Sequence, residues 1–147
     1  MKINLIVIGK LKEKFLVDGG AEYVKRIKIF SRIVIKEISE CRTVDEEGDK
    51  LLAQVPQNSF LIALDVAGEA LTSEKFAEKI SALNLRGISE ITFIIGGAFG
   101  LSDSVRQAAN FKLSLSAMTF THQMARLILV EQIYRAFKIN RGEPYHY

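Results

Sequence analysis

Short apolar runs alternate with longer amphipathic stretches along this chain, and that alternation restricts the folds open to it. The runs, which contain β-branched residues or lie between turn signals, are Ile3–Ile8, Ile33–Ile38, Phe60–Leu64, Ile91–Ile95 and Leu113–Leu115. Strands that alternate with helices at this spacing predict a mainly parallel sheet with helices on both faces. We therefore expect an α/β fold, and 147 residues suit a single domain covering residues 1–147.

The stretches between the runs carry local signals for helix ends. Thr43-Val44-Asp45-Glu46 is typical of a capping box, and Thr72, Ser73, Ser102 and Thr121 are further N-cap candidates. The expected helices run from Glu13 to about Phe30, from Thr43 to about Val55, from Thr72 to Leu83, from Asp103 to Asn110, and from Thr121 through a long last segment. Each of the first four helices therefore connects two strands, as a parallel sheet requires, and the fifth follows the last strand.

A parallel α/β sheet binds its ligands in the loops beyond the carboxyl ends of the strands. In this chain those loops follow Ile8, Leu64, Ile95 and Leu115. The loop after Ile8 holds only Gly9 before a lysine, so the G-x-G-x-x-G signature of dinucleotide-binding folds is absent. The sequence also lacks a P-loop and a G-x-S-x-G elbow, which argues against nucleoside triphosphatases and serine hydrolases. Any cofactor is expected to bind late in the chain.

Composition excludes other classes of protein. No apolar run approaches the ~18 residues of a membrane span, and the charged segment 10–14 follows the apolar start, so we expect a cytoplasmic protein without a membrane partner. Cys41 is the single cysteine, and its role stays open. With His122 and His146 as the only histidines, no spacing typical of metal ligands occurs, and we expect no metal.

Two late segments are candidate ligand loops, each with a plain structural alternative. Gly96, Gly97 and Gly100 lie between a buried strand and a capped helix, where they could form a ligand cradle or a tight turn that needs glycine. The segment 115–120 could wrap an adenine with backbone groups while Met118 and Phe120 pack on the ring. Its alternative is a simple strand-to-helix connection.

The last segment combines aromatic and basic residues in a pattern suited to RNA. Its candidate RNA-binding residues are Arg135, Lys138, Arg141 and Tyr145, because cations hold phosphates and aromatic rings stack on bases. The alternative is a tail that docks through its aromatic residues on a neighbouring surface.

Four separate motifs, taken together, resemble the RlmH family of SPOUT-class ribosomal RNA methyltransferases. They are residues 1–14, Ile95-Gly96-Gly97 with Gly100-Leu101, residues 115–120 with His122, and residues 131–136 with Pro144-Tyr145-His146. The resemblance implies a trefoil knot in about residues 60–147 and a homodimer. It also implies transfer of a methyl group from S-adenosylmethionine to N3 of a pseudouridine in 23S ribosomal RNA, on the assembled ribosome. The chain departs from the family at Thr121, where many members have proline, and at the bulky Phe99.

The resemblance also assigns roles to particular residues. The cofactor contacts fall on Leu64, Gly96, Gly97, Leu115, Ser116, Ala117, Met118, Thr119 and Phe120. The pseudouridine nitrogen must lose a proton, for which His122 and His146 are candidate bases, while Arg135 or Arg141 could stabilise negative charge on the ring. The residues alone leave open a non-catalytic RNA-binding protein or a nucleotide-binding module.

Overall fold

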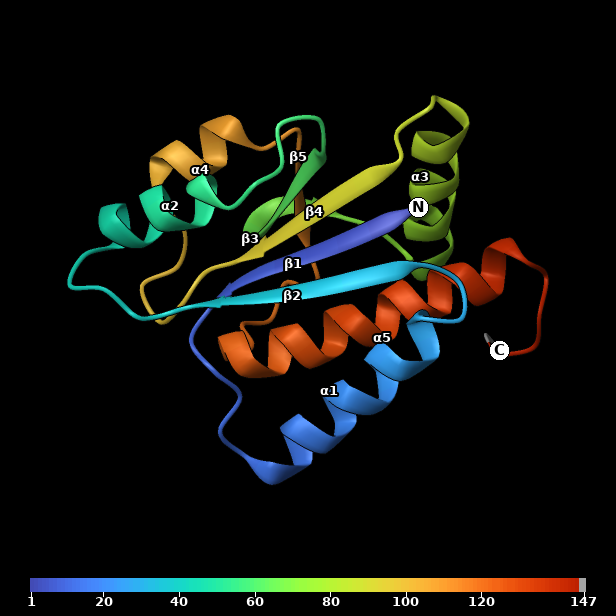
Figure 1. Ribbon diagram of the computed structural model, residues 1–147, viewed down its shortest axis with the longest axis horizontal. Coiled ribbons are helices and arrows are strands. Elements are labelled where there is room, and N and C mark those ends of the chain that lie inside the picture. Colours follow the sequence, from blue (N-terminus) through green and yellow to red (C-terminus); the bar gives the residue numbers. More distant parts are fainter. Residues whose placement is uncertain (146–147) are drawn as a thin grey trace.

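The computed structural model describes residues 1–145 and places five parallel strands in one sheet (Figure 1). The strands are β1 (Lys2–Ile8), β2 (Arg32–Ile38), β3 (Phe60–Ala70), β4 (Glu90–Ile95) and β5 (Phe111–Ser114), in the order β2-β1-β4-β3-β5. The helices are α1 (Lys14–Ile27), α2 (Val44–Ala53), α3 (Ser73–Leu85), α4 (Asp103–Ala108) and α5 (His122–Asn140). Every pairing of neighbouring strands is parallel, so the expected parallel α/β fold is confirmed.

Helices cover both faces of the sheet, as the alternation of buried side chains along β1 requires. Ile3, Leu5 and Val7 belong to the larger core cluster, which α1, α3 and α5 close. Ile6 and Ile8 point to the other face and join a smaller cluster with residues of α2 and α4. Figure 1 shows α2 and α4 together on one side of the sheet and α1 and α5 on the other.

The helix starts follow the sequence signals because capping is a local interaction. Thr43 Oγ1 accepts a hydrogen bond from the Glu46 N–H at 3.1 Å, and Thr72 Oγ1 accepts one from the Lys75 N–H at 3.1 Å. Ser102 and Thr121 cap α4 and α5 in the same way, at 3.2 Å each. Each of these side chains satisfies one of the backbone donors that a helix N-terminus leaves unpaired.

The main departure from the expected elements is β3, which continues to Ala70 instead of ending at Leu64. The apolar pattern stops at Asp65, but the chain remains extended and pairs again with β5 after a register shift between Leu64 and Glu69. Asp65 Oδ1 accepts the Ala67 N–H at 3.0 Å and so stabilises the irregular stretch. Hydrophobic periodicity cannot reveal this second half of the strand, because most of its residues are exposed to solvent. Strand β5 begins at Phe111 and ends at Ser114, earlier than expected.

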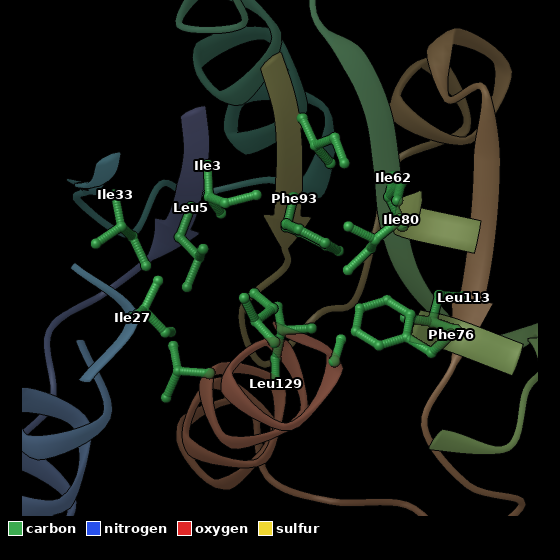
Figure 2. Close-up of a cluster of buried hydrophobic side chains, with 14 of the residues drawn as sticks. Ile3, Leu5, Ile27, Ile33, Ile62, Phe76, Ile80, Phe93, Leu113 and Leu129 are labelled. Atoms are coloured by element: carbon green, nitrogen blue, oxygen red, sulfur yellow. The ribbon is translucent and has the colours of Figure 1, made fainter. Parts of the chain in front are cut away.

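Leu129 of α5 is fully buried against the sheet, where Figure 2 shows it below the labelled side chains of β1 and β4. We expect Leu129→Ala to lower the free energy of unfolding by about 2–5 kcal/mol, because truncation leaves a cavity in a packed core. Leu85→Ala is the matched control: Leu85 is 85% exposed, and its replacement is expected to change stability by less than ~0.5 kcal/mol. Denaturant unfolding followed by circular dichroism measures both. Equal effects of the two substitutions would contradict this packing.

Candidate functional site

A cavity of about 830 Å³ lies at the carboxyl ends of the central and edge strands. Its walls come from residues 64–66 after the regular part of β3, from the glycine loop 95–101 after β4, and from the segment 113–125 around the end of β5. The start of α1 adds Glu13, Phe15 and Leu16. The volume falls in the range of sites for cofactor-sized ligands. The structure thus brings together the loops after Leu64, Ile95 and Leu115, which the sequence predicted as ligand-binding loops.

Most of the expected cofactor residues line this cavity. The lining members of that set are Leu64, Gly96, Gly97, Leu115, Ser116, Met118, Thr119 and Phe120. Ala117 belongs to the same loop but is exposed and does not contribute to the walls.

The glycine loop is a tight turn whose glycines its own packing requires. A Cβ atom at Gly96 would lie 2.4 Å from the Gly100 carbonyl oxygen, and one at Gly97 would lie 2.8 Å from Ile8 Cγ2. Gly100 adopts a positive φ of 77° and donates its N–H to the Gly97 carbonyl at 3.0 Å. The tight-turn interpretation is therefore correct, and the turn itself forms a wall of the cavity, so the cradle interpretation is compatible with it.

The segment after β5 folds back on itself before α5 begins. Ser114 Oγ donates to the Ser116 carbonyl at 3.0 Å, and Ser116 Oγ accepts the Met118 N–H at 3.0 Å. Met118 is 75% exposed and Phe120 is 37% exposed, so both apolar side chains are available to a flat ligand in the cavity. Thr121 caps α5 with its hydroxyl, which shows that the residue in place of the family's proline supports the start of the helix.

An ion pair that the sequence reasoning missed lies in the cavity wall. Arg106 Nε donates to Asp65 Oδ2 at 2.9 Å, and the Asp65 side chain is only 8% exposed. Both residues line the cavity. One feature of the sequence could have indicated this pair: the carboxylate of Asp65 comes directly after Leu64, where the expected strand ends. Its partner comes from α4, which no local pattern links to it.

His122 is the first residue of α5 and lines the cavity. A Cβ atom built on Gly9 would lie 3.8 Å from His122 Nε2 and 3.7 Å from Glu40 Oε1, so both groups lie beside the turn after β1. The candidate base therefore lies at the cavity with a carboxylate close to it.

The candidate RNA-binding residues lie elsewhere, along the second half of α5 and in the segment that follows it. This helix has 19 residues and spans ~28 Å at about 1.5 Å per residue, with His122 at the cavity end. Figure 1 shows the red segment that follows α5 turning back beside that helix. Within one chain, Arg135, Lys138, Arg141 and Tyr145 are therefore not brought together with His122. His146 lies outside the described residues.

Tyr145 docks on α5 and α1. Its hydroxyl donates to Glu131 Oε1 at 3.0 Å, its ring packs edge-on against Tyr134 with centroids 4.8 Å apart, and the Arg135 guanidinium carbon lies 4.7 Å from its centroid. Burial raises the pKa of Tyr145 well above its usual value, and hydrogen bonds with Tyr23 and Glu131 raise it further. The phenol therefore stays neutral near pH 7, and the docked-tail alternative describes the single chain.

The remaining basic residues at this end are also paired. Lys138 Nζ lies 2.7 Å from Glu143 Oε2, and Arg141 Nε lies 2.9 Å from Glu143 Oε1. These two cations lower the pKa of Glu143, with the hydrogen bond from Lys138 as the largest cause. Glu143 thus holds two candidate RNA-binding cations in place.

Residues 1–145 contain neither a membrane-spanning helix nor a metal-binding cluster. None of the helices within residues 1–145 has the length and apolar character needed to cross a membrane. Over the same residues, no group of three or more His, Cys, Asp or Glu side chains is arranged to hold a metal ion.

Comparison with known proteins gives matches along almost the entire chain. The family described as "Predicted SPOUT methyltransferase" matches residues 1–146. Proteins named "Ribosomal RNA large subunit methyltransferase H" from Carboxydothermus hydrogenoformans and Halothermothrix orenii are each 48% identical, over 99% of this chain and 99% of the relative. The crystal structure of a tRNA (m1G37) methyltransferase from Aquifex aeolicus has the same fold, with a TM-score of 0.56 at 14% identity, over 92% of this chain and 70% of that one.

Proposed function

This chain belongs to the SPOUT methyltransferase family, and on that premise we propose that it methylates large-subunit ribosomal RNA with S-adenosylmethionine as the methyl donor. The observation that carries the proposal is the cavity at the strand ends, where three loops far apart in sequence meet. The finer target, N3 of a pseudouridine in 23S ribosomal RNA, comes from the resemblance of the four sequence motifs to the RlmH family.

The residues of the cavity fit the proposed cofactor. Leu64, the glycine loop at Gly96 and Gly97, and the segment 115–120 offer apolar side chains and backbone groups for the adenosine part. The Asp65–Arg106 pair offers one negative and one positive group, which match the ammonium and carboxylate of the amino-acid part. When bound, S-adenosylmethionine supplies an electrophilic methyl group on a positively charged sulfur.

The chain's own residues must then orient the nucleobase and remove its proton. His122 is the proposed base, because it lines the cavity and imidazole is the side chain that most often serves in general acid–base catalysis. The neighbouring Glu40 places a negative charge beside the site at which the ring would become cationic.

We further infer that the enzyme is a homodimer whose second copy completes the site. Arg135, Arg141 and Tyr145 lie along the second half of α5 and do not line their own cavity, so a second chain is needed to bring them to a cavity. The cavity rim also exposes large apolar side chains: Phe15 is 64% exposed and Val66 is 60% exposed, next to the mostly exposed Met118. Such a rim is typical of a surface that another protein covers.

The domain organisation, the ribosomal substrate and the location in the cell are further parts of this proposal. The chain is one SPOUT domain, residues 1–147, with about residues 60–147 forming the trefoil knot. The resemblance to the RlmH family implies that the substrate is the assembled ribosome. The enzyme would then act in the cytoplasm, where ribosomes work.

Calorimetry with S-adenosylhomocysteine separates this function from its alternatives. We expect the purified protein to bind this ligand, and ATP not to displace it, since the cavity offers a site for the amino-acid part and no phosphate-binding motif. A protein that binds ribosomal RNA but not S-adenosylhomocysteine would be a non-catalytic RNA-binding protein. Displacement of the ligand by ATP would indicate a nucleotide-binding module.

A further inference from the structure

Glu47 is a buried carboxylate that does not line the proposed cofactor cavity. It lies in the first turn of α2 and is 2% exposed. Its Oε2 accepts the Cys41 N–H at 3.1 Å, whereas its Oε1 has no hydrogen-bond partner among residues 1–145. A buried acceptor without a partner is destabilising, and more so when it carries charge. Its presence at a buried position therefore calls for an explanation.

The unpaired oxygen lies directly behind the glycine loop. A Cβ atom built on Gly97 would lie 3.5 Å from Glu47 Oε1, so the two groups are in close proximity without a hydrogen bond. The next residue, Gly48, packs tightly on the other end of the loop: its built Cβ would lie 2.0 Å from Ser102 Oγ, the cap of α4. The start of α2 thus supports the loop at both ends, from the side opposite the cavity.

We propose that Glu47 is a positioning residue of the methyl-donor site. Its Oε1 accepts a backbone N–H of the Gly97–Ala98 segment when the loop closes on the cofactor, while Oε2 stays on Cys41. This inference rests on the proposed function, because it assigns the loop to the cofactor. It also explains why the residue is a carboxylate, since each of its two oxygens can accept an N–H group, one from either side.

A purely structural role predicts a different response to the same substitution. If Glu47 served only to hold Cys41, Glu47→Gln would keep that bond through its amide oxygen, and cofactor affinity would follow stability. In the positioning role the amide nitrogen faces the loop with a donor where an acceptor is needed. Replacing a buried, unpaired carboxylate oxygen with an uncharged group would at the same time preserve or raise the stability of the unliganded protein.

The experiment compares the wild type, Glu47→Gln and the matched control Glu46→Gln, which makes the same chemical change at an exposed neighbouring position. Calorimetry gives the affinity for S-adenosylhomocysteine, and thermal unfolding gives the stability without ligand. Amide hydrogen exchange over residues 96–101 reports whether the ligand protects the loop. We expect Glu47→Gln to bind the ligand about 10- to 100-fold more weakly, the usual effect of losing one charge-assisted hydrogen bond. Its unliganded melting temperature should be no lower than that of the wild type, and ligand protection of the loop should be reduced.

Three results would overturn the proposal. The first is an affinity for Glu47→Gln within twofold of the wild type. The second is a lower melting temperature together with a matching loss of affinity, which would make the role structural. The third, failure of the wild type itself to bind S-adenosylhomocysteine, would reject the proposed cofactor site, and it is distinguishable because Glu46→Gln and the wild type would fail alike.

Discussion

The Gly96→Val variant is expected to bind S-adenosylhomocysteine at least ~100-fold more weakly than the wild type while its sheet and helices still form. A Cβ at this position would lie 2.4 Å from the Gly100 oxygen and 2.8 Å from the Gly100 carbonyl carbon, both backbone atoms that cannot turn aside. The loop must therefore open and move a wall of the cavity. Overpacking of this kind costs about 1–3 kcal/mol or more, and ~2.7 kcal/mol corresponds to 100-fold in affinity.

Phe99→Leu provides the control for this substitution, because Phe99 is exposed in the same loop and does not line the cavity. We expect Phe99→Leu to bind with nearly the affinity of the wild type. Calorimetry measures affinity, and circular dichroism shows whether each variant is folded. Full affinity of a folded Gly96→Val variant would remove the glycine loop from the site.

Deletion of Pro144–Tyr147 is expected to lower methyl transfer to ribosomes by at least ~100-fold, the contribution of one acid–base or electrostatic group. Affinity for S-adenosylhomocysteine should stay within about threefold, or ~0.7 kcal/mol, because Tyr145 docks near Glu131, about halfway along α5, and neither residue lines the cavity of its own chain. Calorimetry and incorporation of labelled methyl groups measure the two quantities on one preparation.

Tyr145→Phe is the matched variant for the deletion. It keeps the ring contacts with Tyr134 and Arg135 and removes only the hydroxyl that donates to Glu131. We expect it to retain most of the transfer activity, because the ring and the rest of the tail remain. Wild-type transfer by the truncated protein would show that the tail is dispensable and would leave the proton transfer to His122.

Local signals in the sequence were sufficient for much of the fold. The caps at Thr43, Thr72, Ser102 and Thr121 depend on residues three positions apart, and the strands of the buried sheet depend on their own apolar runs. Ligands of a parallel α/β sheet bind beyond the carboxyl ends of its strands, and this rule located the cavity because it needs only the order of the elements along the chain.

What the sequence did not predict depends on contacts between distant segments. Asp65 and Arg106 are 41 positions apart, and their ion pair exists only once α4 packs beside β3. Glu47 has no pattern that distinguishes it from its exposed neighbours in an acidic turn, yet it alone in that turn is buried under the glycine loop. The outer half of β3 follows from pairing with β5, since its own residues are too polar to indicate a strand.

Mass spectrometry of the RNA product decides whether the protein methylates pseudouridine N3 in large-subunit ribosomal RNA. Ribosomes from a strain that lacks this activity are incubated with the protein and S-adenosylmethionine, and the RNA is digested to nucleosides. We predict that N3-methylpseudouridine forms with assembled ribosomes and far less with free 23S ribosomal RNA. A methyl group on another nucleoside, or none under conditions in which the protein binds S-adenosylhomocysteine, would contradict the account.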